Sequence, residues 1–279
     1  MINIGKFNNL RIARQSDFGY YLDAETGNTS DDILLPLNSA LEKELKIEDR
    51  VDAFIYRDSK DRLIATLKTP YAQVGDIAYL RVAEITKIGA FIDIGLERDI
   101  LVPIKEQNYL LENDQKYLFY IYVDKTGRLA ATTYIDEYLE NTEDYRVGDD
   151  VEGIAYGFQT NGSVMVAVEY KYRGVILKHE YFSRIKPGDF IQLRVKKHYE
   201  DGKMSLTPRK APKDERLELQ DTILDYLKAN NGFMPYNDKS SPEDIKRVFH
   251  QSKNYFKNAL GGLMRQGLID QDENGTKLK

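Results

Sequence analysis

Residues 75–104 read GDIAYLRVAEITKIGAFIDIGLERDILVPI, in which short apolar stretches alternate with polar positions and single glycines interrupt the pattern. Alternation with a period of two predicts strands that are buried on one face. Two further segments share this layout, and in all three a second glycine follows the opening glycine by 14 residues. These pairs are Gly5 and Gly19, Gly75 and Gly89, and Gly148 and Gly162. Such self-similarity predicts three copies of one structural unit.

Each unit continues with a short apolar run and closes on a β-prone stretch that contains a basic residue. The apolar runs span 33–36, 100–103 and 175–178, and the closing stretches span 61–66, 127–132 and 202–207. Several short strands within about 65 residues predict a small barrel or sandwich. Polar or proline-containing breaks near residues 69, 141 and 212 predict linkers between the units.

A change of period after Pro212 predicts a different kind of domain. Apolar residues now recur at helical spacing, which predicts three helices whose buried stripes are Leu217, Ile223, Leu224 and Leu227, then Ile245, Val248 and Phe249, then Phe256, Ala259, Leu260, Leu263 and Met264. Ser241 precedes the second helix and is suited to cap it, and the third helix follows Ser252. An Asn274-Gly275 turn between residues 267–269 and 276–278 predicts a hairpin. Three helices and a hairpin describe an α+β winged helix.

Bulk composition restricts the location of the chain. It has no cysteine, so disulfides and thiolate sites are excluded, and its first residues carry no basic segment followed by an apolar run. Charges interrupt every stretch long enough to span a bilayer. We expect a cytoplasmic protein without a membrane partner. Residues 1–140 contain 17 basic and 24 acidic residues, whereas residues 209–279 contain 13 basic and 11 acidic residues. Any electrostatic attraction for nucleic acid therefore favours the C-terminal half.

The residues that catalysis would require do not form a recognisable pattern. The three histidines, His179, His198 and His250, lack metal-ligand spacing, and the sequence has neither a phosphate-binding glycine loop nor a serine nucleophile elbow. We therefore predict that the protein is not an enzyme and uses no metal or cofactor.

The residues around the second glycine of each unit are candidates for binding. Phe18 and Tyr21 flank Gly19, and Phe91 follows Gly89. A bulge at the glycine would turn two such rings to one sheet face, where bases can stack at about 1 to 3 kcal/mol each. Basic residues of the closing strands, Arg62, Arg128 and Lys203, could then contact phosphates or bases. In the alternative interpretation, the rings fill the barrels and the basic residues are solvated.

These features resemble the RNA-binding S-one domain, named after the ribosomal protein that repeats it, which is a five-stranded OB-fold barrel. The resemblance rests on the Phe-Gly-Tyr-Tyr-Leu-Asp and Ile-Gly-Ala-Phe-Ile-Asp sequences, the Leu-Val-Pro-Ile run and an Asp followed four residues later by Arg. It implies OB-fold barrels at 1–69, 70–140 and 141–211, followed by the winged helix at 212–279. The implied RNA-binding residues are Phe18, Tyr21, Asp58 and Arg62 in the first repeat and Phe91, Asp124 and Arg128 in the second. The third repeat keeps only Lys203 of this set.

Basic side chains supply the other candidates. Lys178, Lys196 and Lys197 join Lys203 in the third repeat, where tyrosines are interspersed. The polar face of the third predicted helix carries Lys253, Asn254, Lys257, Asn258 and Arg265, which would enter a groove of duplex DNA if the module binds it. Both sets are equally explained as solvated surface.

The order of three barrels and this module, together with the run Ser-Lys-Asn-Tyr-Phe-Lys-Asn-Ala-Leu-Gly-Gly-Leu-Met, resembles the conserved virulence factor B family of bacterial RNA-binding proteins. The resemblance implies a non-catalytic protein that binds RNA, in our expectation single-stranded, and acts in the regulation of gene expression. Two alternatives remain open at this point. The chain could be a DNA-binding regulator that acts through residues 212–279, or a scaffold for protein interactions.

Overall fold

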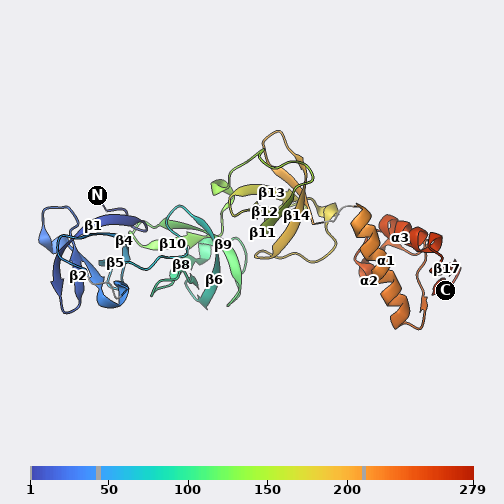
Figure 1. Cartoon of the computed structure of the whole chain (residues 1–279), viewed down its shortest axis with the longest axis horizontal. Coiled ribbons are helices and arrows are strands. Elements are labelled where there is room, and N and C mark those ends of the chain that lie inside the picture. The colour runs from blue at the N-terminus through green and yellow to red at the C-terminus, as the bar shows by residue number, and fades with distance from the viewer. Residues whose placement is uncertain (1, 42–44, 209–211) are drawn as a thin grey trace.

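Three closed five-stranded barrels follow one another along the chain and lead into a winged-helix module (Figure 1). The computed structural model describes residues 2–41, 45–208 and 212–279. The predicted fold class, tandem all-β OB-type barrels followed by an α+β winged helix, is confirmed. No helix in these ranges is both long enough and apolar enough to cross a membrane.

The strands of each barrel alternate between buried and exposed positions, as the sequence pattern predicts. The first barrel contains β1 (Phe7–Ser16), β2 (Gly19–Leu22), β3 (Ile33–Pro36), β4 (Arg50–Arg57) and β5 (Leu63–Thr66). The second contains β6 (Ile77–Thr86), β7 (Gly89–Ile92), β8 (Ile100–Pro103), β9 (Lys116–Val123) and β10 (Leu129–Thr132). The third contains β11 (Asp150–Phe158), β12 (Val164–Val168), β13 (Tyr172–Ile176), β14 (Phe190–His198) and β15 (Met204–Thr207).

The second glycine of the first two repeats is required by a close backbone approach. Gly19 and Gly89 pair with Pro36 and Pro103, and a Cβ on either glycine would lie 2.2 Å from a carbonyl oxygen of the facing strand. Their φ angles, +148° and +150°, also favour glycine. The predicted bulge at the glycine was wrong, because the irregularity lies in the partner strand, for example between Ile12 and Arg14.

The third repeat is offset by one residue from the alignment that the sequence predicts. In the first two barrels a 3-10 turn begins directly after Pro36 or Pro103, and in the third it begins directly after Leu177. Val164 pairs with Ile176, so the place opposite Leu177 falls to Ser163 and not to Gly162. Met165, and not Val164, therefore corresponds to Tyr21 and Phe91.

The barrels are joined by apolar contacts between neighbours. Phe54 and Tyr56 of β4 pack within the core cluster of the second barrel. Ile154 and Tyr156 of β11 pack against Leu118 of β9 in the same way. Because these side chains are buried and come from opposite sides of each junction, they hold successive barrels in a continuous row.

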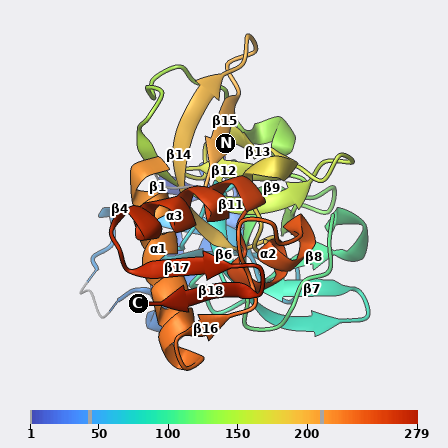
Figure 2. The same cartoon turned by 90° about the vertical axis from the view of Figure 1, so that its right-hand side faces the viewer.

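The C-terminal module has the order of elements of a winged helix. Its elements are α1 (Pro212–Ala229), β16 (Phe233–Met234), α2 (Pro242–Phe249), α3 (Lys253–Arg265), β17 (Ile269–Asp272) and β18 (Gly275–Leu278), with the sheet order β16-β18-β17 (Figure 2). Ser241 caps α2 as predicted, and Ser252 caps α3 in the same way, each accepting a hydrogen bond from a backbone N–H of the first turn. Two predicted core residues were wrong, since Leu217 and Met264 are exposed. Leu219 is buried instead, because it shares the face of Ile223 and Leu227.

Candidate nucleic-acid interface

A row of side chains crosses the same face of each of the first two barrels. In the second barrel Phe91 pairs with Leu101, Leu101 with Ala130, and Ala130 with Tyr122. The corresponding row of the first barrel is Tyr21, Leu34, Ile64 and Tyr56. Each row thus has an aromatic ring at both ends. Sequence reasoning missed Tyr56 and Tyr122, although both precede the predicted Asp58 and Asp124 by two residues.

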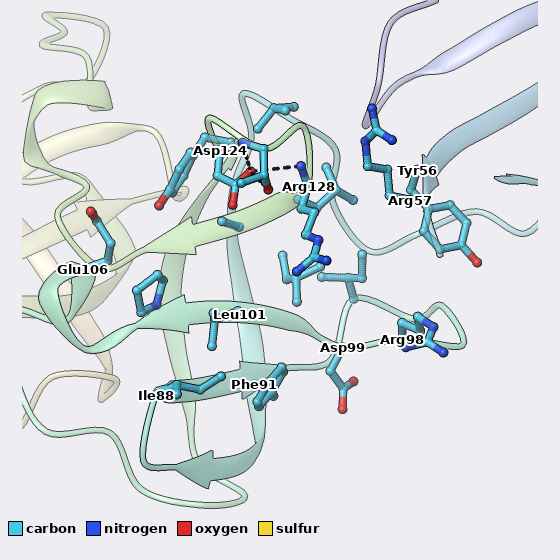
Figure 3. A pocket seen from close by; sticks show the side chains of 18 of the residues that line it. Tyr56, Arg57, Ile88, Phe91, Arg98, Asp99, Leu101, Glu106, Asp124 and Arg128 are labelled. Carbon is cyan, nitrogen blue, oxygen red and sulfur yellow. Dashed lines mark hydrogen bonds between the residues drawn. The ribbon is translucent and has the colours of Figure 1, made fainter. Parts of the chain in front are cut away.

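The row of the second barrel lies in a groove of about 700 Å³ that also borders the first barrel, here called the inter-barrel groove. Figure 3 shows Phe91 and Leu101 on β7 and β8, with Asp124 and Arg128 facing them from the β9–β10 turn. The first barrel contributes Tyr56, Arg57, Asp58 and Ser59. Basic side chains surround the rings: Arg57, Arg98, Lys105, Lys125 and Arg128. A cleft that combines rings with cations can hold both the bases and the phosphates of a nucleic acid strand.

Arg128 joins the two barrels across this groove. Its Nη2 atom lies 2.6 Å from Oδ2 of Asp61 in the first barrel, and this hydrogen bond holds the pKa of Asp61 below its ordinary value. The Nε atom of Arg57 donates to the carbonyl oxygen of Gly127, 3.2 Å away. Asp124 does not pair with the Arg128 side chain, because it accepts hydrogen bonds from Thr126 and the Arg128 backbone and so holds the turn. Among the described residues, Arg98, Lys105 and Lys125 form no ion pair.

Of the predicted residues of the first barrel, Phe18 and Arg62 are exposed and Tyr21 and Asp58 are half-buried, and all but Phe18 contact another side chain. Phe18 is 76% exposed in the β1–β2 turn. The guanidinium of Arg14 lies 3.5 Å from the ring centroid of Tyr21, so it covers one face of that ring. Arg62 donates to Oδ2 of Asp58 through Nη2 at 2.7 Å. Burial tends to raise the pKa of Asp58, but the hydrogen bonds from Arg62 and Lys60 outweigh it and lower that pKa.

The third barrel departs from this arrangement. Met165 lies over Gly157 and packs on the cluster that joins the second and third barrels, so its platform position is covered. A separate groove of about 730 Å³, here called the third-barrel groove, contains Lys197, Tyr199 and Lys203. The Lys197 ammonium lies 4.5 Å from the Tyr199 ring centroid.

Two other predicted lysines lie outside the third-barrel groove and have internal partners. Lys196 donates to the buried carboxylate of Glu180 at 2.6 Å. Burial tends to raise the pKa of Glu180, but the Lys196 and Thr207 hydrogen bonds hold it below its ordinary value. Lys178 donates to the Tyr181 hydroxyl at 3.1 Å. These hydrogen bonds indicate that both lysine side chains stabilise the fold of the unbound protein.

The five predicted residues of α3 lie on its accessible side. Asn254, Lys257, Asn258 and Arg265 are exposed, and Lys253 is half-buried. Gly261 lies on the same side, where an added Cβ would meet only the Arg265 side chain at 3.8 Å. Its neighbour Gly262 differs, because a Cβ there would clash with Gln220 of α1 at 1.9 Å. Glycine inside a helix costs about 1 kcal/mol relative to alanine, and close packing against α1 explains why glycine stands at position 262.

Comparison with known proteins agrees with this architecture. A family profile described as "S1 domain" matches residues 4–68 and 74–134, the first two barrels, and one described as "CvfB-like winged helix domain" matches residues 221–278. The protein named Conserved virulence factor B of Staphylococcus aureus (strain USA300) is 31% identical over 81% of this chain and 78% of its own length. The chain belongs to the conserved virulence factor B family.

Two further relatives extend the similarity over nearly the whole chain. An uncharacterized protein of Bacillus subtilis, YitL, is 32% identical over 96% of this chain and 91% of its own. A crystal structure from Streptococcus pneumoniae, described as a multidomain protein with nucleic acid binding domains, superimposes with a TM-score of 0.55 at 27% identity. That alignment covers 99% of this chain and 98% of the other.

The domain types of this family member indicate nucleic acid as its class of partner. S1 barrels and winged helices are nucleic-acid-binding modules, and neither is known as an enzyme. Within the described ranges, no three His, Asp or Glu side chains are grouped so that they could hold a metal ion. The inter-barrel groove is built mainly from rings and cations, which are groups suited to bind nucleic acid.

Proposed function

We propose that the protein binds single-stranded RNA without altering it, and that the inter-barrel groove is the principal site. The observation that carries this proposal is the convergence of Phe91 and Tyr122 with Arg57 and Arg98 around one groove. Rings accept bases of any sequence by stacking, and cations follow the backbone. A duplex does not present its base faces in this way, which favours an unpaired strand as the ligand.

The third-barrel groove provides a second contact of a different kind. Lys197 and Lys203 lie beside Tyr199 in this groove, and the residue that corresponds to Tyr21 and Phe91 is Met165, which has no ring and does not line the groove. Binding here would depend mainly on charge and therefore on salt. RNA contact is thus divided between rings in the first two barrels and cations in the third, and Phe18, Tyr21 and Arg62 extend the ring-based part.

A binder without catalytic groups acts on an RNA by occupying it. We propose that such occupation regulates gene expression in the cytoplasm, by shielding a strand from competing proteins or from base pairing. The exposed polar residues on α3 favour one second candidate, in which the winged helix binds duplex DNA. Among the described residues, the side chains of Asn254, Lys257 and Asn258 have no ion-pair or hydrogen-bond partner that would have to be released first.

Fluorescence anisotropy of the full chain tests the proposal. We expect a labelled, unstructured RNA of about 16 nucleotides to bind more tightly than DNA of the same sequence or than duplex DNA. The logarithm of the affinity should fall with the logarithm of salt concentration by about 0.7 for each phosphate contact. Preferential binding of duplex DNA that is lost on Lys257→Ala with Arg265→Ala would replace the proposal with the second candidate. Absence of any salt-sensitive RNA binding would refute it.

A further inference from the structure

A third groove, of about 590 Å³, lies where the second barrel meets the third. Its wall includes three tyrosines from three separate segments: Tyr71 from the segment before β6, Tyr79 from β6, and Tyr170 from the β12–β13 turn. We call it the tyrosine groove. When the repeats are aligned, none of these three tyrosines corresponds to a ring of the inter-barrel groove.

Tyr71 presents the face of its ring to the groove. Its backbone N–H donates to the carbonyl oxygen of Ile94 at 2.8 Å. A Cβ added to Gly95 would lie 3.0 to 3.1 Å from three atoms of the Tyr71 ring, so the ring lies flat against this glycine. Tyr71 is nevertheless 68% exposed, which leaves the opposite face of the ring open. An anchored ring with one open face is already arranged for stacking.

Tyr79 and Tyr170 form a stacked pair across the junction. Their ring centroids are 6.2 Å apart at an interplanar angle of 30°, and the Tyr79 hydroxyl donates to the carbonyl oxygen of Gly188 at 2.7 Å. Tyr170 lies in the three-residue loop between the paired residues Val168 and Tyr172. Glu169 and Tyr170 are the central residues of a β-turn in this loop, and both have positive φ angles, 51° and 58°. Such turns favour asparagine and glycine, so a tyrosine at this place is unexpected from backbone preference alone.

The charges of the tyrosine groove favour a polyanion. The carboxylate of Asp93 is occupied, because it accepts from Arg81 at 3.3 Å and from the backbone N–H of Gly95 at 2.8 Å. Lys116 lies 5.9 Å from the Tyr79 ring centroid and has no ion-pair partner among the described residues. A groove for proline-rich peptides would also use tyrosines, but the cation left unpaired here complements phosphate.

We propose that the tyrosine groove binds a second segment of single-stranded nucleic acid, with bases on Tyr71 and Tyr170 and a phosphate at Lys116. This inference rests on the proposed function for the class of ligand, but it assigns a different surface. The ligand would then contact the second barrel on two grooves, so the junction between the second and third barrels becomes part of the binding surface.

Two variants of the full chain separate binding from folding. Tyr170→Gly removes the ring. The fold should be retained, because glycine adopts the positive φ of this position without strain. Combined with Tyr71→Ala, it should weaken binding of an unstructured oligoribonucleotide by about tenfold or more. The matched control is Phe190→Ala with Phe233→Ala, which removes two exposed rings that line none of the three grooves. The control should leave the affinity unchanged.

A local probe provides an independent readout. The chain contains no tryptophan, so Tyr71→Trp introduces a single fluorescent reporter. Its emission should be quenched when the oligoribonucleotide binds. Unchanged affinity in the double variant together with unquenched emission would overturn the inference while the wild-type chain still binds RNA. Quenching by a proline-rich peptide but not by RNA would also overturn it. If the wild-type chain binds no RNA at all, the proposed function itself fails.

Discussion

Gly89→Ala should unfold or severely loosen the second barrel. The new Cβ would lie 2.2 Å from the carbonyl oxygen of Val102 and 3.0 Å from Cα of Pro103, both of which are backbone atoms of the paired strand. Relief requires β7 and β8 to separate, and the φ of +150° adds strain for any residue with a side chain. We expect a loss of about 3 kcal/mol or more of the local free energy of unfolding.

Hydrogen exchange followed by mass spectrometry measures this loss for each barrel separately, which a single melting curve of a multidomain chain does not. Peptides from residues 77–132 should exchange faster, while those from the winged helix should be unaffected. Gly27→Ala is the matched control, because Gly27 also has a positive φ but no atom lies within 4 Å of its added Cβ. It should cost only about 1 kcal/mol. Equal effects of the two substitutions would contradict the close-approach explanation.

Phe91→Ala combined with Arg128→Ala should weaken binding of single-stranded RNA by about 30-fold, because it removes one stacking ring and one cation from the inter-barrel groove. Tyr21→Ala combined with Arg62→Ala should have a smaller effect. In the unbound protein Arg14 already covers one face of Tyr21, and Arg62 is paired with Asp58. Both affinities can be measured by anisotropy at one fixed salt concentration.

Asp61→Asn is the control that isolates the role of Arg128. It breaks the same ion pair between the barrels but leaves the guanidinium available to RNA. We expect unchanged or tighter binding. A loss as large as that of the Phe91 and Arg128 double variant would show that the ion pair acts by holding the barrels together. Phe190→Ala with Arg247→Ala removes the same residue types outside the grooves and should have no effect.

The features that the sequence predicted correctly are those with local signals. Ser241 caps its helix through a hydrogen bond to the residue three positions later. The predicted hairpin also forms, although its two turn residues are Glu273 and Asn274, because Gly275 already pairs with Asp272. The repeated barrels follow from alternation and from glycines whose neighbours in space lie on the next strand of the same unit. Each of these signals requires only the residues of one repeat.

The features that the sequence did not predict depend on contacts between repeats. In the sequence, Tyr56 and Arg57 look like ordinary strand residues. Their importance lies in contacts with the second barrel, which the sequence of the first repeat does not contain. The partner of Arg128 is Asp61, 67 positions away, and not the nearby Asp124. The sequence did not reveal the one-residue offset of the third repeat, because Gly162 follows Gly148 by the same 14 residues as in the other repeats. In the structure Ser163, and not Gly162, lies opposite Leu177.

Photocrosslinking of the full chain to an unstructured RNA containing iodouridine tests the central claim most directly, because this base reacts with aromatic rings on which it stacks. After digestion, mass spectrometry identifies the crosslinked peptides. We predict crosslinks to peptides containing Phe91 or Tyr122, and their loss when unlabelled RNA competes. Crosslinks confined to the winged helix, or none on the second barrel despite saturating RNA, would contradict the placement of RNA in the inter-barrel groove.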